Sequence, residues 1–324
     1  MGNSFQDYWQ ARKPVLDEAF QREISRLLEN MPSRQTAALM ATLMAGKKIR
    51  GCLSCLVSDA LGGTLAGALP RAVAVEMIQA ATLIHDDFVD QDAMRGKRPA
   101  AWTLEGGRRA VLIGDVIFAT AIKRMNDLSR ADGLAVSQAI AQVARGALHE
   151  PLEPFILAEE IESGRMEGPV YEKIIRLKTG ILFGTACHLG ALATQANGRV
   201  GEISFRYGMS IGEAYQIADD CKEVEHHLVR GSIDPGQMAA LTPALLYFVP
   251  DMRAHILAHL QGESPNLSAS EAEFFRMAEK LMKGEIEKRL QASISEMAGN
   301  FPEGEFGEMM RQAPWDLIRM FNES

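Results

Sequence analysis

Apolar residues recur at intervals of three and four along almost every long segment of this 324-residue chain. The stretch AVAVEMIQAATLIHDDFVDQ, residues 72–91, shows the pattern most clearly, with Val75, Ile78 and Thr82 followed by the Leu83 and Ile84 pair. This period is that of a helix with one buried face, whereas strand-like alternation is almost absent. The pattern predicts an all-α fold in which residues 72–91 form a long, mostly buried helix.

Further helices follow from the same spacing and from the turn residues that separate the segments. We expect them at roughly 5–30, 33–45, 48–61, 107–127, 133–148, 169–195, 200–228, 239–261, 270–298 and 304–322. Ser270 and Glu273 would form a capping box at the start of one of them. Because no break has the length of an inter-domain linker and no solenoid repeat is present, we expect one bundle of ten or more helices without strands, a single domain over 1–324.

The composition excludes some classes of protein. The chain carries 34 Lys and Arg against 42 Asp and Glu, a net charge of −8, and it lacks the concentrated basic face of a nucleic-acid-binding protein. We find no signal pattern at the N-terminus and no apolar run of membrane-spanning length, so we expect no transmembrane segment. The four cysteines, with Cys52 and Cys55 in an isolated CxxC pair, indicate a reduced, cytoplasmic protein without a zinc or redox site.

Two acidic clusters of the same form stand at the ends of apolar helical stretches. The first contains Asp86, Asp87 and Asp90, and the second contains Asp219, Asp220 and Glu223. In each, the outer acids are four residues apart, so that a helix presents them on one face, where like charges repel. A solvated helix end explains one such cluster but not two. Carboxylate oxygens with room for water suit Mg²⁺, which also binds substrate phosphates.

Basic residues accompany the first cluster and a segment upstream of it. RGKRP places Arg95, Lys97 and Arg98 directly after the aspartates, and GKKIR, residues 46–50, opens another helix with Lys47, Lys48 and Arg50. Arginine binds phosphate through a planar fork and lysine as a point charge, and a helix N-terminus also favours anions. Acids for a metal and cations for phosphate together predict a diphosphate ligand.

With these features in place, the chain resembles a trans-prenyltransferase of the polyprenyl diphosphate synthase family, the class I isoprenoid synthases. The resemblance rests on five stretches in the family's own order, namely GKKIR, LIHDDFVDQDAMRGKRP, AVLIGDVIFATA, RLKTGILF and GEAYQIADDCKEV. It implies an isoprenoid-synthase-like bundle of long antiparallel helices around a deep central cavity, usually in a homodimer. The two aspartate motifs would face each other across the mouth of that cavity.

The resemblance also implies a role for individual residues. The Mg²⁺ ligands, for three ions bound with the substrate diphosphate, would be Asp86, Asp90 and Asp219, with Asp87, Asp220 and Glu223 in secondary roles. The allylic diphosphate would contact Arg95, Lys178 and Arg230. The isopentenyl diphosphate would contact Lys47, Arg50 and Gln79. The dipoles that stabilise the carbocation would come from Lys178, Thr179 and Gln216.

Four positions depart from the family pattern. Gln79 stands where the family usually has His, Gly96 replaces the second of two arginines, Gln237 lies where a Gly-Lys stretch is expected, and Glu223 replaces an Asp. Three of these changes remove a side chain that would hold a diphosphate, and a neutral hydrogen bond is weaker than a charged one. The metal ligands are therefore expected to be intact and acceptor binding to be reduced.

The leading hypothesis is a Mg²⁺-dependent head-to-tail condensation of an allylic prenyl diphosphate with isopentenyl diphosphate. The alternatives are a different acceptor, ionisation of a prenyl diphosphate followed by hydrolysis or cyclisation without isopentenyl diphosphate, and a non-catalytic subunit of a heteromeric synthase. Chain length would be set below Asp86 by Ile78, Ala81 and Thr82. Because Ala81 and Thr82 are small, we expect a linear product of geranylgeranyl length or longer.

One further pair of residues has the spacing of a metal site. His255 and His259 are four apart, but they lack the Glu of the zinc-protease pattern. We therefore expect them on an exposed helix face.

Overall fold

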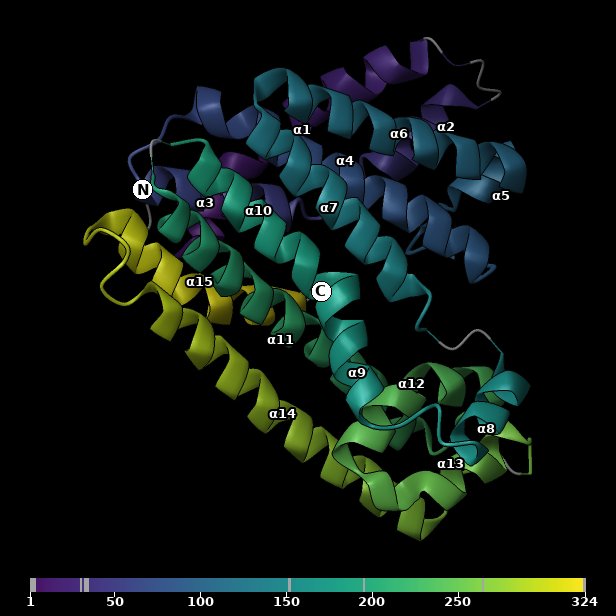
Figure 1. Ribbon diagram of the computed structural model, residues 1–324. Coiled ribbons are helices and arrows are strands. Elements are labelled where there is room, and N and C mark those ends of the chain that lie inside the picture. The colour runs from purple at the N-terminus through teal and green to yellow at the C-terminus, as the bar shows by residue number, and fades with distance from the viewer. Residues whose placement is uncertain are drawn as a thin grey trace. The chain divides into compact units, whose positions relative to one another are not determined.

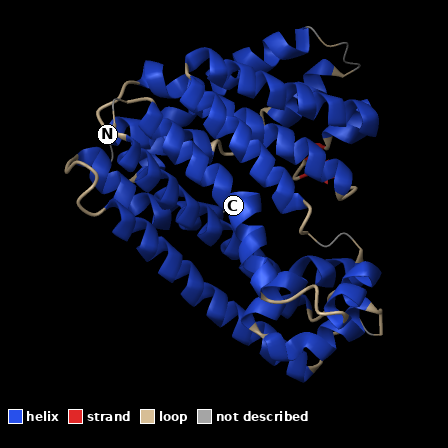
Figure 2. Ribbon diagram, in the orientation of Figure 1, coloured by secondary structure: helices blue, strands red, loops and turns tan. Residues whose placement is uncertain are grey.

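The computed structural model describes residues 4–29, 31, 35–150, 153–194, 196–263 and 265–322. Most of them are helical, and the strands in this part of the chain are two residues long (Figure 2). The prediction of an all-α fold is confirmed. The chain divides into two compact units, Met1–Ala141 with Leu182–Gly208 and Glu296–Ser324, and Gln142–Ile181 with Met209–Ser295. The prediction of a single domain over 1–324 stays a prediction.

The first unit contains the N-terminal helices and the C-terminal helix. Its complete elements are α1 (Phe5–Glu29), α2 (Thr36–Leu43), α3 (Ile49–Ala60), α4 (Leu65–Val89), β1 (Met94–Arg95), β2 (Arg98–Pro99), α5 (Ala101–Glu105), α6 (Gly107–Leu128) and α15 (Glu305–Asn322). Most of α7 (Arg130–Ala147) and α10 (Ile181–Leu192), the start of α11 (Gly198–Arg230) and the end of α14 (Ala269–Met297) also belong to it. The helix predicted at 33–45 begins at Thr36, and residues 33 and 34 lie outside the described residues.

Helix α4 is the core of the first unit and packs against α3 and α6. It begins earlier than the stretch 72–91 because the side chain of Thr64 caps it, accepting a hydrogen bond from the N–H of Gly67. Its residues include many with no exposed surface, such as Val75, Met77 and Ile78. By length and composition alone α4 could cross a membrane, but this is weak evidence, because 61% of its apolar stretch is buried inside the protein.

The RGKR stretch forms a short hairpin, which the sequence analysis missed. Strands β1 and β2 pair Met94 with Pro99 and Arg95 with Arg98. Gly96 lies in the turn with a φ of +60°, a conformation that costs little only for glycine. The glycine that replaces the family's second arginine therefore has a local structural reason.

The second unit contains the helices in the middle of the chain. These are α8 (Pro154–Glu162), α9 (Pro169–Ile174), the π-helix η1 (Ile175–Gly180), α12 (Pro235–Phe248), the 3₁₀-helix η2 (Pro250–Met252) and α13 (Arg253–Leu260), with the end of α7 and most of α11 and α14. Helices α8, α12 and α13 pack together (Figure 1).

Two boundaries in the second unit differ from the prediction. The helix predicted over 239–261 is broken after Phe248, because Pro250 lacks an N–H and disfavours helical geometry at Val249. The capping box of α14 was placed two residues too late. It is made by Ser268, whose N–H donates to Glu271 Oε2 at 2.6 Å, and by Glu271, whose N–H donates to Ser268 Oγ at 3.3 Å.

Candidate functional site

The first acidic motif forms the C-terminal end of α4. The backbone N–H of Asp90 donates to the carbonyl of Asp86 at 2.8 Å, so that the helical turn holds both carboxylates on one side. Asp86 is partly exposed and Asp90 is exposed. This end of α4 presents two accessible carboxylates one turn apart, as the i, i+4 spacing predicts.

Asp87 lies between them in a different environment. It is 3% exposed, and it accepts hydrogen bonds from Arg95, at 3.0 Å from Nε to Oδ2 and also from Nη2 to Oδ1. This bidentate pair ties the hairpin that follows α4 back to the helix. The side chain of Arg95, which we expected to contact the allylic diphosphate, is 35% exposed and thus also reaches solvent.

The second acidic motif lies on α11, within the second unit. Asp219 and Glu223 are exposed and one turn apart. Loss of surrounding water raises the pKa of Asp219, although part of its side chain reaches solvent, and the charge of Glu223 raises that pKa further, against Lys178 and Lys222. The two carboxylates thus carry a mutual repulsion that a cation would relieve.

Asp220 is held by two hydrogen bonds. Its Oδ2 accepts from the hydroxyl of Tyr171 at 2.5 Å, and its Oδ1 accepts from Nε2 of Gln216 at 3.1 Å. Burial raises the pKa of Asp220 to about 6, although both hydrogen bonds lower it. Both oxygens are oriented by neutral donors, which leaves the negative charge available to a cation.

The π-helix η1 carries Lys178 and Thr179, which we predicted to stabilise the carbocation together with Gln216. The hydroxyl of Thr179, which is 5% exposed, donates to Oε1 of Gln216 at 2.6 Å, so a hydrogen-bonded chain runs from Thr179 through Gln216 to Asp220. Lys178 forms an ion pair with Glu150. π-Helical turns are rare in proteins, and those that occur often lie at functional sites. The structure thus brings Thr179, Gln216 and Asp220 together in one network, with the charge of Lys178 acting on Asp220.

The residues predicted for isopentenyl diphosphate lie in the first unit. Lys47 donates to the carbonyl of Met320 at 2.7 Å, and the guanidinium of Arg50 lies 4.4 Å from the ring centroid of Phe183. Gln79 is partly exposed on α4.

The start of α3, which carries Arg50, is anchored by an acid that the sequence analysis missed. The N–H of Gly51 donates to Glu76 of α4 at 2.7 Å, and burial raises the pKa of Glu76 while Lys48 lowers it. Lys48 itself is buried and has a left-handed backbone with a φ of +53°. Such conformations are uncommon outside glycine and cluster at ligand-binding segments.

The residues predicted to set chain length are all buried on α4. Ile78 and Ala81 have no exposed surface and Thr82 is 9% exposed. The hydroxyl of Thr82 donates to the carbonyl of Gln79 at 2.9 Å, so it is satisfied within the helix and the methyl group is the part available for packing. Their role in chain length stays a prediction.

Two further predicted positions lie near the end of α11. Arg230 is the last residue of that helix and is exposed. Gln237, noted because it replaces a cation, belongs to a capping box at the start of α12: Asp234 accepts from the N–H of Gln237 at 2.9 Å, and the Gln237 side chain accepts from the N–H of Asp234 at 3.2 Å. A lysine at this position could not complete that box, because it has no acceptor.

The expectation for the histidine pair was wrong. His259 is 3% exposed, and its Nε2 lies 3.0 Å from Oε1 of Glu271, which is also 3.3 Å from Nδ1 of His255. Glu271 is twelve residues beyond His259. A helix-spacing argument could not have found this partner, since α13 and α14 are separate elements.

Carboxylate oxygens are the metal donors that the two motifs offer. Among the described residues, no group of three or more His, Cys, Asp or Glu side chains is gathered closely enough to hold a metal alone. Mg²⁺ does not require such a cage, because it is bound by one or two carboxylates together with waters and substrate phosphates. The exposed pairs Asp86 with Asp90 and Asp219 with Glu223 fit that requirement in charge and in donor type.

Comparison with known proteins identifies the sequence family to which these features correspond. A family model described as "Polyprenyl synthetase" matches residues 33–227. A geranylfarnesyl diphosphate synthase of Aeropyrum pernix is 32% identical over 58% of this chain and 61% of its own length, and a geranylgeranyl diphosphate synthase of Mycobacterium tuberculosis is 33% identical over 54% and 50%. In these alignments the chain therefore spans about half to three fifths of the relatives.

The fold also matches a solved structure over almost its full length. The polyprenyl synthetase of Streptomyces coelicolor A3(2) superimposes with a TM-score of 0.73, covering 97% of this chain and 98% of that one, at 20% sequence identity. At this identity the likeness shows the fold alone. It agrees with the all-α architecture expected from the sequence.

Proposed function

Since the chain belongs to the polyprenyl synthetase family, we propose that it is a prenyltransferase that condenses an allylic prenyl diphosphate with isopentenyl diphosphate, head to tail. The product would be a linear polyprenyl diphosphate of geranylgeranyl length or longer. The observation that carries the proposal is that each acidic motif of the family sequence presents two carboxylates that reach solvent one helical turn apart, on α4 and on α11.

In this reaction the allylic C–O bond breaks and negative charge develops on the leaving diphosphate. Mg²⁺, when bound to the diphosphate, supplies Lewis-acid stabilisation of that charge. The residues that would hold it are Asp86, Asp90 and Asp219, with Asp87, Asp220 and Glu223 supporting them. Arg95, Lys178 and Arg230 would neutralise the remaining charge, and Lys47, Arg50 and Gln79 would hold the isopentenyl diphosphate.

The allylic carbocation left behind must be stabilised without a nucleophile. The Thr179–Gln216–Asp220 chain fixes the orientation of a hydroxyl and an amide next to the π-helix, and oriented dipoles of this kind stabilise positive charge with little reorganisation. With Lys178, Thr179 and Gln216 in this role, attack by the isopentenyl alkene forms the new C–C bond. The proton then lost would pass to the released diphosphate, so no histidine base is required.

The departures at Gln79 and Gly96 favour a second candidate, an enzyme that ionises a prenyl diphosphate without using isopentenyl diphosphate. Gln79 offers a neutral hydrogen bond where the family has His, and Gly96 is committed to a turn. Binding of the acceptor is the step that these replacements weaken, whereas the metal motifs are unaffected. A non-catalytic subunit of a heteromeric synthase is the third possibility.

One assay distinguishes the three. The protein is incubated with Mg²⁺, an allylic diphosphate and labelled isopentenyl diphosphate, and the products are identified by mass. Elongated labelled product of twenty carbons or more is expected. Diphosphate release without incorporation of label supports the second candidate, and no turnover of either kind supports the third.

Asp86→Asn tests the metal motif within the same assay. Because it removes one of two accessible carboxylates on α4, turnover should fall by about 100-fold or more. Asp127→Asn is the matched control, because Asp127 is an exposed acid on α6 that pairs with Lys123. Equal activity of Asp86→Asn and the control would contradict the proposal.

We further propose that the protein works in the cytoplasm as a homodimer, or with a heteromeric partner. Small prenyl diphosphates would be its substrates, and nucleic acid is not expected as a partner. Four buried, free cysteines support a reducing compartment. An apolar stripe on α6, with Leu112 and Val116 exposed, supports self-association.

A further inference from the structure

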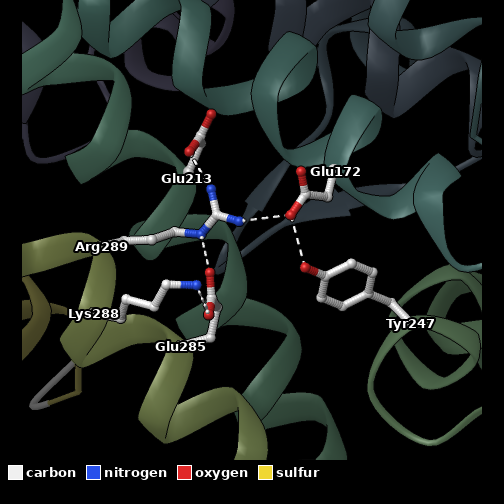
Figure 3. Close-up of polar contacts among 6 residues, drawn as sticks. All are labelled: Glu172, Glu213, Tyr247, Glu285, Lys288 and Arg289. Atoms are coloured by element: carbon white, nitrogen blue, oxygen red, sulfur yellow. Dashed lines mark hydrogen bonds and ion pairs between the residues drawn. The ribbon is translucent and has the colours of Figure 1, made fainter. Parts of the chain in front are cut away.

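Arg289 of α14 lies outside every motif described so far and beyond the segment matched by the family model. Its side chain is only 15% exposed, and its guanidinium contacts three carboxylates on three different helices (Figure 3). Nε lies 3.0 Å from Glu285 of α14, Nη2 lies 3.1 Å from Glu172 of α9, and Nη1 pairs with Glu213 of α11. One planar cation thus connects α9, α11 and α14.

The contact with Glu213 leads to the second acidic motif. Gln216 and Asp220 follow Glu213 by three and seven residues on the same helix, so all three share one face. The stem of Glu213 also packs against the end of the π-helix, since a Cβ at Gly180 would lie 3.1 Å from Cγ of Glu213. A shift of Glu213 would therefore be transmitted to the residue that follows Thr179.

The contact with Glu172 leads to Asp220 from the opposite direction along the chain. Glu172 is adjacent to Tyr171, whose hydroxyl donates to Oδ2 of Asp220. Tyr247 adds a second support, because its hydroxyl donates to Oε1 of Glu172 at 2.7 Å and its ring lies 5.6 Å from that of Tyr171. Arg289 therefore acts on both donors that orient Asp220, through Glu172 on one side and through Glu213 on the other.

We propose that Arg289 is a positioning residue for the diphosphate and metal site, setting the spacing of α9 and η1 from α11 so that Asp220, Gln216 and Thr179 keep their geometry. The inference rests on the proposed function. Arg289 does not touch the substrate. It acts through the residues that orient a metal ligand, and replacing such outer residues costs about 10- to 100-fold in metal affinity or activity.

The charges around Arg289 explain why a neutral or shorter side chain would not serve. Glu172, Glu213 and Glu285 are three acids around one cation, and without Arg289 they would repel one another and separate the helices. Burial raises the pKa of Glu213, and Arg289 counteracts that effect. Lysine keeps the charge but cannot reach three carboxylates in one plane.

Three variants and one matched control test the proposal. Arg289→Met removes the cation, and Arg289→Lys keeps the charge but loses the planar guanidinium. Glu172→Gln removes the charge of one of the three carboxylates that Arg289 contacts. Because the Glu172 side chain is half-exposed, this change should have little effect on folding. The control is Lys288→Gln, because Lys288 is exposed and pairs with Glu285 of its own helix (Figure 3). Urea unfolding reports the stability of each variant.

The deciding measurements are the Mg²⁺ concentration for half-maximal activity and the affinity for inorganic pyrophosphate in the presence of Mg²⁺, by calorimetry on folded protein. We expect Arg289→Met to weaken both by about tenfold, with smaller losses in Arg289→Lys and Glu172→Gln and none in the control. The KM for isopentenyl diphosphate should be unchanged. A merely structural role would reduce the folded fraction, and hence kcat, while leaving the Mg²⁺ and pyrophosphate affinities of folded protein as in wild type; that result overturns the proposal.

The outcome also separates this inference from the proposed function. If the wild type elongates prenyl chains and Arg289→Met keeps its Mg²⁺ dependence, the inference fails and the function stands. If the wild type does not elongate but Mg²⁺-dependent pyrophosphate binding is lost in Arg289→Met and retained in Lys288→Gln, the function fails and the positioning role stands.

Discussion

Asp86, Asp87 and Asp90 occupy three different environments on one helix end. Asp86 and Asp90 are accessible, whereas Asp87 is almost fully buried against Arg95. Consecutive residues on a helix point in different directions, so a motif of like residues can combine accessible acids with a structural one. We propose that the accessible pair serves the metal and that Asp87 holds the hairpin that carries Arg95.

The Asp87–Arg95 pair allows a prediction at this scale. Arg95→Gln leaves a buried carboxylate without its charged partner, so the free energy of unfolding should fall by about 1.5–3 kcal/mol. The KM for the allylic diphosphate should rise as well. Urea unfolding and steady-state kinetics measure the two effects.

Lys97→Gln is the control for Arg95→Gln. Lys97 is exposed in the turn of the same hairpin, so its replacement should leave stability within about 0.5 kcal/mol of wild type. If the two variants were equally stable, the Asp87–Arg95 pair would have no structural role.

Among the elements, α14 shows how one acid can serve both a helix end and a buried contact. Glu271 accepts a hydrogen bond from the N–H of Ser268 in the capping box. Its Oε1 also lies within hydrogen-bond distance of Nε2 of His259 on α13. The box therefore fixes the start of α14 and joins it to a neighbouring helix. The same residue type two positions along, Glu273, pairs with Arg276 on the surface.

The pKa of Glu271 gives a pH-dependent prediction for this element. Burial would raise that pKa, but the hydrogen bonds from Ser268, with His259 and His255, outweigh it and hold the pKa below its ordinary value of 4.5. A carboxyl group with a lowered pKa stabilises the folded state above pH 4.5 and loses that contribution as pH falls through its lower folded-state pKa. Glu271→Gln should therefore be less stable than wild type by about 1 kcal/mol at neutral pH.

Thermal unfolding measured from pH 7 down to pH 3 tests this expectation. The difference between wild type and Glu271→Gln should shrink below pH 4.5. Glu273→Gln, at the exposed acid, should follow the wild-type curve throughout. A difference that did not change with pH would show that the charge of Glu271 is not responsible.

At the scale of the whole molecule, an exposed apolar surface on α6 raises the question of self-association. Leu112 and Val116 are 52% and 41% exposed on α6, and they line an apolar groove of about 130 Å³ with Leu28, Met31 and Leu39. Exposed apolar surface of this kind is covered in many proteins by a second chain. We propose that a second copy of this chain covers it.

The double replacement of Leu112 and Val116 by Asp should convert the protein from the mass of two chains to that of one. Light scattering after size-exclusion chromatography gives the mass, and far-UV circular dichroism shows whether the helices persist. Replacing Leu281, an exposed residue on α14, by Asp should leave the mass unchanged. A wild type that is already a single chain would contradict the proposal of a homodimer.

The helices and the two acidic motifs were predictable from the sequence because their signals are local. Helical periodicity and i, i+4 spacing relate residues that the backbone itself brings together, and α1, α6, α11 and α14 begin and end within a few residues of the prediction. Two boundary errors, at Val249–Pro250 and at the capping box of α14, arose where proline and a competing cap were not weighed. The hairpin of β1 and β2 and the short helices α5 and α8 were not predicted.

The connections of the candidate site could not be read in the same way, because their partners are far apart along the chain. Tyr171 reaches Asp220 across 49 residues, and Arg289 reaches Glu213 across 76 and Glu172 across 117. No local pattern marks such a pair, since a single tyrosine or arginine on a helix is more often exposed.

The sequence alone therefore determined the fold class and the family resemblance, and it predicted the residues that would hold metal and diphosphate, because each depends on spacing within one segment. Only the tertiary structure decided that Asp87 is buried, that His259 is enclosed, and that Arg289 pairs with Glu172 and Glu213. Burial and long-range pairing are properties of packed helices, and they do not exist until the helices meet.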